Sequence, residues 1–272
     1  MNFPDSAKAL GGILALTVVM AFDGRVQAQN AIRSGFDQSF LDRNDDGSTG
    51  IVPMGFQIDF FGNAHSDLYV NNNGNVTFNA PQSEYSPKPL SSLQGDVISP
   101  FWADVDTRSP DSAVVTYGTG TVDGYNAFGV NWVNVGYYAA HADLLLSCQL
   151  VIIDRSDLAA GDFDLEFNYD KVQWQWGDVT VGVPPRAGFA SSGIGYELPG
   201  SGVLDSFLDS NLSTGLIHND LNSSVLGRYV FSFRDGMPAP VPEPTTLALI
   251  GAGLLVTGGL ARKRRETLRA LP

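Results

Sequence analysis

An Asp- and Asn-rich run early in the chain has the spacing of a calcium-binding loop. Residues 42–47 read DRNDDG, so that Asp42, Asn44 and Asp46 stand at positions one, three and five of the pattern D-x-N-x-D-G. Oxygen atoms at these positions can converge on a hard cation. Position twelve is Pro53, where an EF-hand needs a bidentate Glu, and no helix is expected on either side. The run therefore predicts either a looser Ca²⁺ site or a polar turn before the first long strand.

A second pair of carboxylates, Asp104 and Asp106, ends an apolar stretch that is predicted to be a strand, residues 97–105. Residues two apart on a strand point to the same face. Two carboxylates there repel each other unless a cation or a hydrogen-bond donor lies between them. The pair therefore predicts either Ca²⁺ binding or a strand end whose carboxylates meet water. Glycoside hydrolases also work with a pair of carboxylates. The sequence around Asp104 and Asp106 singles out no further acidic position that could complete such a pair, so the pattern does not favour a hydrolase.

Two tryptophans, Trp174 and Trp176, are also two residues apart and are predicted to share one face of a strand. Aromatic faces pack against the apolar faces of ligands, so an exposed pair could form a platform on which a sugar stacks. The alternative is that these large side chains pack in the core. The sequence leaves both interpretations open.

The other residues able to do chemistry do not form a catalytic pattern. The three histidines, His65, His141 and His218, are far apart and lack the spacing of metal ligands. The single cysteine, Cys148, lies in the apolar run 144–153, which is typical of a buried strand. A catalytic thiol needs a positive, partly exposed setting instead. Nucleophile-elbow, phosphate-loop and zinc-helix motifs are absent from the sequence. We therefore predict no enzymatic activity.

The net charge of −13 is unevenly distributed along the chain. The segments 1–28 and 242–272 carry net charges of 0 and +3, which leaves −16 on the residues between them. So acidic a body repels nucleic acid and anionic membranes, because phosphate contacts need Lys and Arg. Acidity suits solubility or the binding of divalent cations. We therefore expect no nucleic-acid partner.

The first 28 residues have the features of a signal peptide. An apolar run of 14 residues, 9–22, follows Lys8 and is too short to span a membrane comfortably. The small residue Ala28 stands just before a plausible cleavage position at Gln29. The prediction is a signal peptide over 1–28, removed by signal peptidase, with the rest of the chain exported.

The C-terminal segment combines a proline-rich motif, a short apolar run and a basic cluster. The apolar run, 245–261, has 17 residues, at the low end for a transmembrane helix. The basic tail, 262–272, would stay cytoplasmic by the positive-inside rule, so the body would lie outside. Both ends thus predict the same topology. The residues that carry the motif and the cluster are Pro242, Glu243, Pro244, Arg262, Lys263, Arg264 and Arg265.

This order of features resembles the PEP-CTERM sorting signal of Gram-negative bacteria. The resemblance implies that an exosortase in the inner membrane recognises and cleaves the tail, so that the membrane anchor is transient. The prolines keep the segment extended and exclude helix there, which leaves an accessible backbone just outside the bilayer. The alternative is a permanent single-span anchor.

Between the two ends, short apolar segments alternate with turn residues. Asn73-Gly74 and Asp123-Gly124 are hairpin signals. The glycine-rich stretch 118–124 is also expected to form hairpin turns, and only 203–212 shows a weak helical pattern. The predicted fold class is all-β, a single sandwich-like extracellular domain. The predicted strands are residues 56–60, 68–70, 76–78, 97–105, 114–117, 127–138, 144–154, 163–169 and 229–234.

This middle region resembles the NIDO domain, the extracellular module first named for nidogen. The residues that carry the resemblance are 68–78, 98–107, 130–138, 163–174, 187–189 and 227–231. The predicted organisation is an acidic lead-in over 29–54, a NIDO-like domain over 55–235 and a proline-rich linker over 236–244. NIDO modules occur in matrix and adhesion proteins, and no catalytic activity is attached to them. The resemblance therefore implies adhesion.

Together these features predict an exported, non-enzymatic surface or extracellular matrix protein, acting in cell–matrix adhesion or in association with a biofilm or exopolysaccharide. The alternative is a lectin-like module that binds carbohydrate, with or without Ca²⁺. The predicted partners are signal peptidase and exosortase during export, the inner membrane transiently, and extracellular polysaccharide or matrix components. The only cofactor that the pattern suggests is Ca²⁺.

Overall fold

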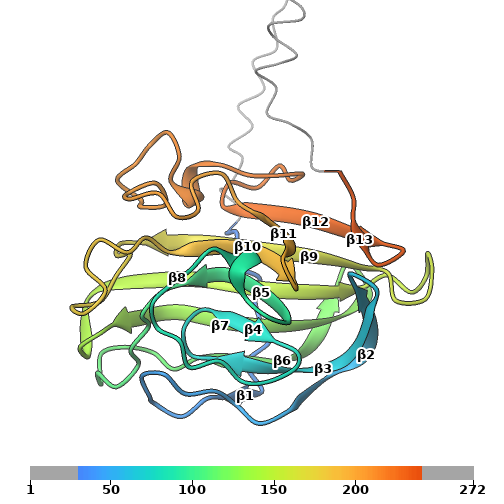
Figure 1. The fold of residues 1–272 in the computed structure, drawn as a ribbon, viewed down its shortest axis with the longest axis horizontal. Helices are drawn as coiled ribbons and strands as arrows, with labels where there is room; N and C mark the ends of the chain where they lie inside the picture. Colours follow the sequence, from blue (N-terminus) through green and yellow to red (C-terminus); the bar gives the residue numbers. More distant parts are fainter. Residues whose placement is uncertain (1–29, 241–272) are drawn as a thin grey trace, which may run out of the picture.

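The computed structural model describes residues 30–240, which form two antiparallel β-sheets (Figure 1). Within this range there is no α-helix, and two 3₁₀ turns occur, η1 (Leu90–Ser92) and η2 (Leu216–His218). The all-β prediction is therefore confirmed. No helix in this range is long and apolar enough to cross a membrane. The predicted signal peptide, the sorting motif from Pro242 and the apolar run 245–261 lie outside the described residues.

The larger sheet has seven strands in the order β1-β6-β7-β8-β9-β12-β13. Both of its outermost strands have two residues, which limits the edge that another chain could pair with. The strands are β1 (Ser39–Phe40), β6 (Thr116–Val122), β7 (Tyr125–Tyr137), β8 (His141–Asp154), β9 (Phe163–Val172), β12 (Arg228–Arg234) and β13 (Met237–Pro238).

The smaller sheet has six strands in the order β11-β10-β5-β4-β3-β2. All seven residues of its strand β5 are buried, as expected for a strand that is covered on both faces. The strands are β2 (Val52–Phe60), β3 (Asn63–Asn71), β4 (Asn75–Thr77), β5 (Asp96–Trp102), β10 (Arg186–Ser191) and β11 (Ile194–Glu197).

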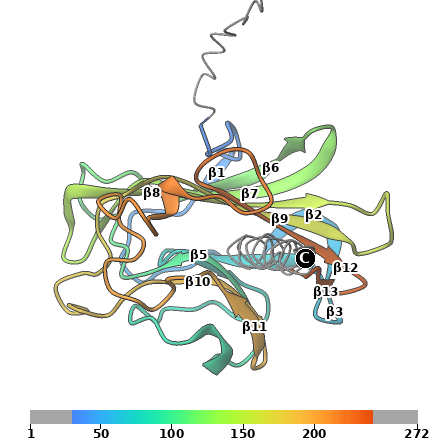
Figure 2. The ribbon, with the colours of Figure 1, turned by 90° about the horizontal axis from the view of Figure 1, so that it is seen from above.

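The two sheets lie face to face (Figure 2), and aromatic rings from both meet in the core. Phe163 on β9 and Phe233 on β12 stack with their centroids 4.4 Å apart. From the other sheet, Phe60 and Phe189 pack against Phe233 with centroids at 5.4 and 5.0 Å. Each of these rings is fully buried, and such burial contributes roughly 1.5–3 kcal/mol per side chain. These contacts hold the two layers together.

Both predicted Asn-Gly and Asp-Gly hairpins are present, with different loop lengths. Asp123 and Gly124 form a two-residue loop in which both residues have positive φ, 51° and 89°. The loop between β3 and β4 has three residues, 72–74, because Asn71 pairs with Asn75. Only Gly74 in this loop has positive φ, 76°. The side chains of Asn72 and Asn73 point away from this turn and donate hydrogen bonds to the segments 45–46 and 105.

The glycine-rich stretch 118–124 is mostly strand, and its prediction as hairpin turns is wrong up to Val122. The glycines make room for Phe36, which packs on the outer face of the larger sheet with 3% of its surface exposed. A Cβ atom at Gly120 would lie 2.8 Å from the Phe36 ring, and one at Gly129 on β7 would lie 2.4 Å from it. Because the two glycines have no side chains, the Phe36 ring can pack directly against the backbone of the sheet.

The segment around Phe36 is held to the larger sheet by hydrogen bonds between side chains of the sheet and the backbone of the segment. Gln149 accepts a hydrogen bond from the Arg33 amide at 3.0 Å and donates one to the Arg33 carbonyl at 2.8 Å. Asn131 donates to the Phe36 carbonyl at 2.9 Å. The Arg33 guanidinium pairs with Glu166 through two bonds of 2.6 and 2.8 Å. The acidic lead-in therefore begins as part of the packed body.

Two further sequence expectations differ from the structure. Residues 203–212 contain turns in place of the weakly predicted helix, because Phe207 is buried in the core and Gln175 accepts the Asp205 amide. Strands β10 and β11 were not predicted, because glycines interrupt the apolar pattern. One of them, Gly188, allows close approach of the two strands: its Cβ would lie 2.1 Å from the Tyr196 carbonyl oxygen.

The Gly74 position gives a test of the β3–β4 loop. A Cβ atom there would lie 1.8 Å from the carbonyl oxygen of Phe101, and the positive φ disfavours any other residue. We expect Gly74→Ala to lower the free energy of unfolding by about 1–3 kcal/mol or more. Urea unfolding measures this change. Gly50→Ala is the matched control, because nothing lies within 4 Å of its added Cβ. Equal effects of the two substitutions would contradict the described loop.

Candidate metal centre

The loop that follows β1 is tied to the segment that follows β5. Arg43 donates hydrogen bonds from one guanidinium nitrogen to the carbonyl oxygens of Thr107, Ser109 and Ser112, at 2.5–2.7 Å. The Asn44 and Thr107 backbones are linked as well, since the Thr107 amide donates to the Asn44 carbonyl at 2.9 Å. Two segments more than sixty residues apart are therefore held side by side.

Asn44 shapes the turn of this loop. Its side-chain oxygen is already hydrogen-bonded within the turn and is not free to bind a cation beside the carboxylates. Its Oδ1 accepts the Gly47 amide at 2.6 Å, and its Nδ2 donates to the Asp42 carbonyl at 2.5 Å. The side chain of Asp42 is on the exposed side of the turn. The alternation that suggested Asp42, Asn44 and Asp46 as joint ligands is thus broken, because the turn uses Asn44 for its own backbone.

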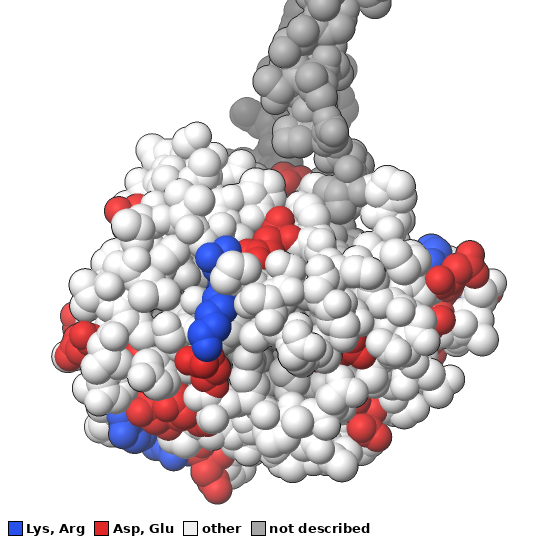
Figure 3. Space-filling view, viewed as in Figure 1, with Lys and Arg blue, Asp and Glu red and all other residues white. Residues whose placement is uncertain are grey.

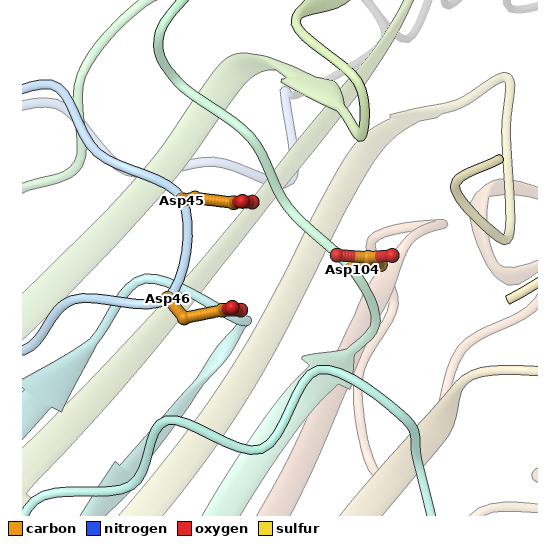
Figure 4. Close-up of side chains that lie close together, drawn as sticks. All are labelled: Asp45, Asp46 and Asp104. Carbon is orange, nitrogen blue, oxygen red and sulfur yellow. The ribbon is translucent and has the colours of Figure 1, made fainter. Parts of the chain in front are cut away.

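Three carboxylates converge where the two segments meet (Figure 4). Asp45, Asp46 and Asp104 each offer an oxygen, and these oxygens lie within 4.8 Å of one another. Asp104 has 2% of its surface exposed, and the other two are half-buried. The sequence pattern included Asp46 and Asp104 but passed over Asp45, which occupies an even position of the D-x-N-x-D-G template. The only feature of the sequence that could have pointed to Asp45 is its position directly beside Asp46, a predicted ligand.

Each of the three carboxylates is anchored through one oxygen. Asp46 Oδ1 accepts a hydrogen bond from Asn73 at 2.8 Å, and Asp104 Oδ2 accepts one from the Thr180 hydroxyl at 3.3 Å. Asp45 Oδ2 lies 3.0 Å from the Arg108 guanidinium. Within the described part of the chain, the second oxygen of each has no hydrogen-bond donor, and Asp45 Oδ1 is buried in addition. Each carboxylate therefore keeps at least one oxygen free of hydrogen bonds within the described part of the chain, in a group whose members lie close together.

Asp106 is separated from this group by its own partners. Its carboxylate accepts bonds from the Arg108 side chain at 2.5–3.1 Å and from the Ala140 amide at 2.7 Å. Strand β5 ends at Trp102, so Asp104 and Asp106 are not on a strand as predicted. They do not act as a pair, because one carboxylate is neutralised and the other joins the loop carboxylates. Although burial raises the pKa of Asp106, the bonds from Arg108 and Ala140 lower it overall.

Electrostatics make the three-carboxylate group unfavourable at neutral pH unless positive charge is added. Burial, followed by the charges of Asp106 and Asp46, raises the pKa of Asp45 to about 6. Burial, followed by the charge of Asp45, raises the pKa of Asp104 to about 7. A hard divalent cation bound by carboxylate oxygens would relieve both effects. The donor set is all oxygen, which suits Ca²⁺ and does not suit Zn²⁺.

The other residues that the sequence singled out are not members of this group, although Trp176 immediately precedes Gly177, where an added Cβ would lie 2.8 Å from Asp104 Oδ2. Trp174 is 4% exposed and donates its indole N–H to the Val135 carbonyl, so it packs in the core. Trp176 is half-buried, and both follow the end of β9 at Val172 in a segment that forms no strand. Cys148 is fully buried on β8, and burial raises the pKa of its thiol. His65 and His141 each face one carboxylate, Asp96 and Asp178 respectively.

Comparison with protein-family models matches residues 66–235 to the nidogen-like domain. The chain belongs to the nidogen-like domain family. Strand β2 and the loop with Asp45 and Asp46 precede the matched range, whereas Asp104 lies within it. A second model, the PEP-CTERM protein-sorting motif, matches residues 240–265. Both predicted resemblances are therefore confirmed, and the sorting motif implies export, sorting to the cell surface and processing by an exosortase.

Two curated relatives illustrate the distance within the nidogen-like family. The chain is similar to alpha-tectorin of Mus musculus, with 28% identity over 188 residues, which cover 58% of this chain and 8% of the relative. It is similar to nidogen of Drosophila melanogaster, with 28% identity over 201 residues, which cover 63% and 14%. The chain thus spans a small part of the length of these relatives. No solved structure matches.

The raised pKa values predict how pH and Ca²⁺ act together on this nidogen-like domain. Asp45 and Asp104 titrate near 6 and 7 when folded and near 4 when unfolded, so their favourable contribution to stability is lost as the pH rises through 6 and 7. We expect Ca²⁺ to restore stability above that range, by about 2.7 kcal/mol at a hundred times Kd, or roughly 5–10 °C in Tm. Thermal unfolding followed by circular dichroism measures this. A Ca²⁺ effect as large at pH 5 as at pH 7.5 would contradict the prediction.

Asp104→Asn and Asp42→Asn separate the observed group from the sequence pattern. Asp104→Asn removes a buried charge, so without Ca²⁺ at pH 7.5 we expect unchanged stability or a gain of about 1 kcal/mol, together with loss of the Ca²⁺ response. Asp42→Asn is the matched control and keeps the response, because Asp42 faces outward. Isothermal titration with CaCl₂ and thermal unfolding measure both properties. Loss of the response in the Asp42 variant alone would favour the sequence pattern.

Proposed function

We propose that this protein is a non-enzymatic component of the extracellular matrix or cell surface, acting in cell–matrix adhesion or in association with a biofilm exopolysaccharide. The observation that carries the proposal is the order of two matches on one chain, a nidogen-like domain over 66–235 followed at once by a sorting motif over 240–265. The body would be exported after removal of 1–28, held by 245–261 with 262–272 in the cytoplasm, and released or transferred by the exosortase.

The charged side chains of the body favour a partner that is not anionic. On the face shown in Figure 3, acidic side chains are spread widely and basic side chains lie beside them. Among residues 30–240, all Lys and Arg side chains form ion pairs except Arg43 and Lys171, which bond to backbone carbonyls and to Asn134. Within 30–240 no group of unpaired Lys and Arg side chains therefore remains to hold a phosphate backbone or an anionic lipid surface.

A non-catalytic role is supported by how the reactive groups are used. The thiol of Cys148 is enclosed in the core with a raised pKa, which disfavours the nucleophilic thiolate. Of the predicted carboxylate pair, Asp106 is neutralised by Arg108 and Asp104 is turned toward Asp45 and Asp46. These placements favour cation binding over acid–base catalysis at this position.

Calcium-dependent binding of carbohydrate is the second candidate function, and the three-carboxylate group is the observation that favours it. Trp176 keeps part of its surface accessible for such a role, whereas Trp174 is used by the core.

The intact mass of the protein recovered from the native cell surface tests the proposed delivery. We expect a mass that begins near Gln29 and ends near Pro242, because both predicted cleavages would then have occurred. Replacement of Pro242, Glu243 and Pro244 by Ala should leave 262–272 attached and the protein in the inner-membrane fraction. Glu266→Ala, outside the motif, is the control and should be processed normally. A wild-type surface protein that retains Arg262 to Arg265 would contradict exosortase processing.

A further inference from the structure

Two adjoining hollows lie at one end of the six-stranded sheet, away from the carboxylate group. The larger, with a volume of about 490 Å³, is walled by the start of β3, the start of β5 and the turn after β10. The smaller, about 170 Å³, lies between β4, β5 and the loops 79–82 and 93–95. Asn79, Gly95 and Asp96 line both hollows, so the two adjoin each other, and the pair is called the trough below.

The floor of the larger hollow is a rigid polar arrangement. Asp96 is 4% exposed, and its Oδ2 lies 2.7 Å from His65 Nε2 and 3.1 Å from Asn63 Nδ2. The His65 ring is stacked on Phe78, with centroids 4.4 Å apart, which sets its orientation. The Asp96 amide in turn donates to Asn79 Oδ1 at 3.3 Å. Side chains held in this way are ready to meet a ligand without further ordering.

Both donors and acceptors remain unused along the trough. Asn63 Oδ1, Asn79 Nδ2 and the Ser192 hydroxyl have no hydrogen-bond partner among the described residues, and all three residues are exposed at the rim. Each of these free groups could exchange a hydrogen bond with a ligand that carries hydroxyl groups.

The lining also limits the chemical class of the ligand. Neither hollow is lined by Lys or Arg, and the only carboxylate in the walls is Asp96, which faces His65. An anionic ligand would therefore meet no Lys or Arg there. The apolar side chains of Pro81, Leu93 and Val97 line the smaller hollow and suit the C–H faces of a sugar ring.

We propose that this trough binds a neutral oligosaccharide, with sugar hydroxyls bonded to Asn63, Asn79 and Ser192. Two adjoining hollows suit a chain of sugar units better than one monosaccharide. The inference rests on the proposed function for its setting, since an exported matrix protein meets extracellular polysaccharide. It names a site that is distinct from the tryptophans and from the three-carboxylate group.

Binding of defined hexasaccharides tests the proposal. The probes are cellohexaose, mannohexaose and a galactose hexamer, with oligogalacturonate as the anionic counterpart, titrated against the full chain in a detergent without a sugar headgroup. We expect at least one neutral probe to bind and the anionic probe not to bind. Asn79→Ala and Ser192→Ala should each weaken binding about two- to tenfold, because each removes one hydrogen bond to the ligand. Isothermal titration measures the affinities.

Ser192→Ala keeps the proposal falsifiable if Asn79→Ala disturbs the fold. It removes an exposed hydroxyl that has no partner among the described residues, so a purely structural role predicts no loss of stability and no effect on binding. Asn126→Ala, an exposed asparagine at a different hollow near β6, is the matched control and should bind as the wild type does. Absence of binding to every neutral probe, or unchanged affinity in both trough variants, would overturn the inference. Either result would leave the intact-mass test of cell-surface delivery unaffected.

Discussion

The candidate metal centre depends on the hydrogen bonds that the buried asparagines of the β3–β4 turn make. Asn72 donates to the backbone carbonyls of Asp45 and Val105, and Asn73 donates to the Asp46 side chain while accepting the Val105 amide. One three-residue loop thereby joins the segment before β2 to the segment after β5. Its close approach to Phe101 requires Gly74, so a single glycine sets the position of both segments.

Gathering three carboxylates at this junction works against the folded state, because burial and mutual repulsion both oppose ionisation. The protein offsets part of this with Arg108, which pairs with Asp106 and also contacts Asp45. That leaves the group around Asp104 short of positive charge in a body that is itself acidic. Cation binding and export to the cell surface fit together, since divalent cations would then supply the charge that the chain lacks.

The antiparallel order of the smaller sheet places its two candidate sites at opposite ends. β3 and β5 both begin beside the trough with Asn63 and Asp96, and both end beside the carboxylate group at Asn71 and Trp102. The buried strand β5 therefore connects the two ends with seven enclosed residues.

The sequence by itself determined the all-β class, most strand positions, both hairpins, and the two family resemblances, because these depend on local alternation, on turn residues and on short ordered motifs. Tertiary structure decided which carboxylates meet. Asp45, and not Asp42, belongs to the carboxylate group because Asn44 turns the loop. Asp106 does not belong to it because Arg108 neutralises its carboxylate. The trough was equally hidden, since Asn63, Asn79, Asp96 and Ser192 lie far apart along the chain. Spacing within one segment predicts a shared face, but only the pairing of distant strands can bring such side chains to one place.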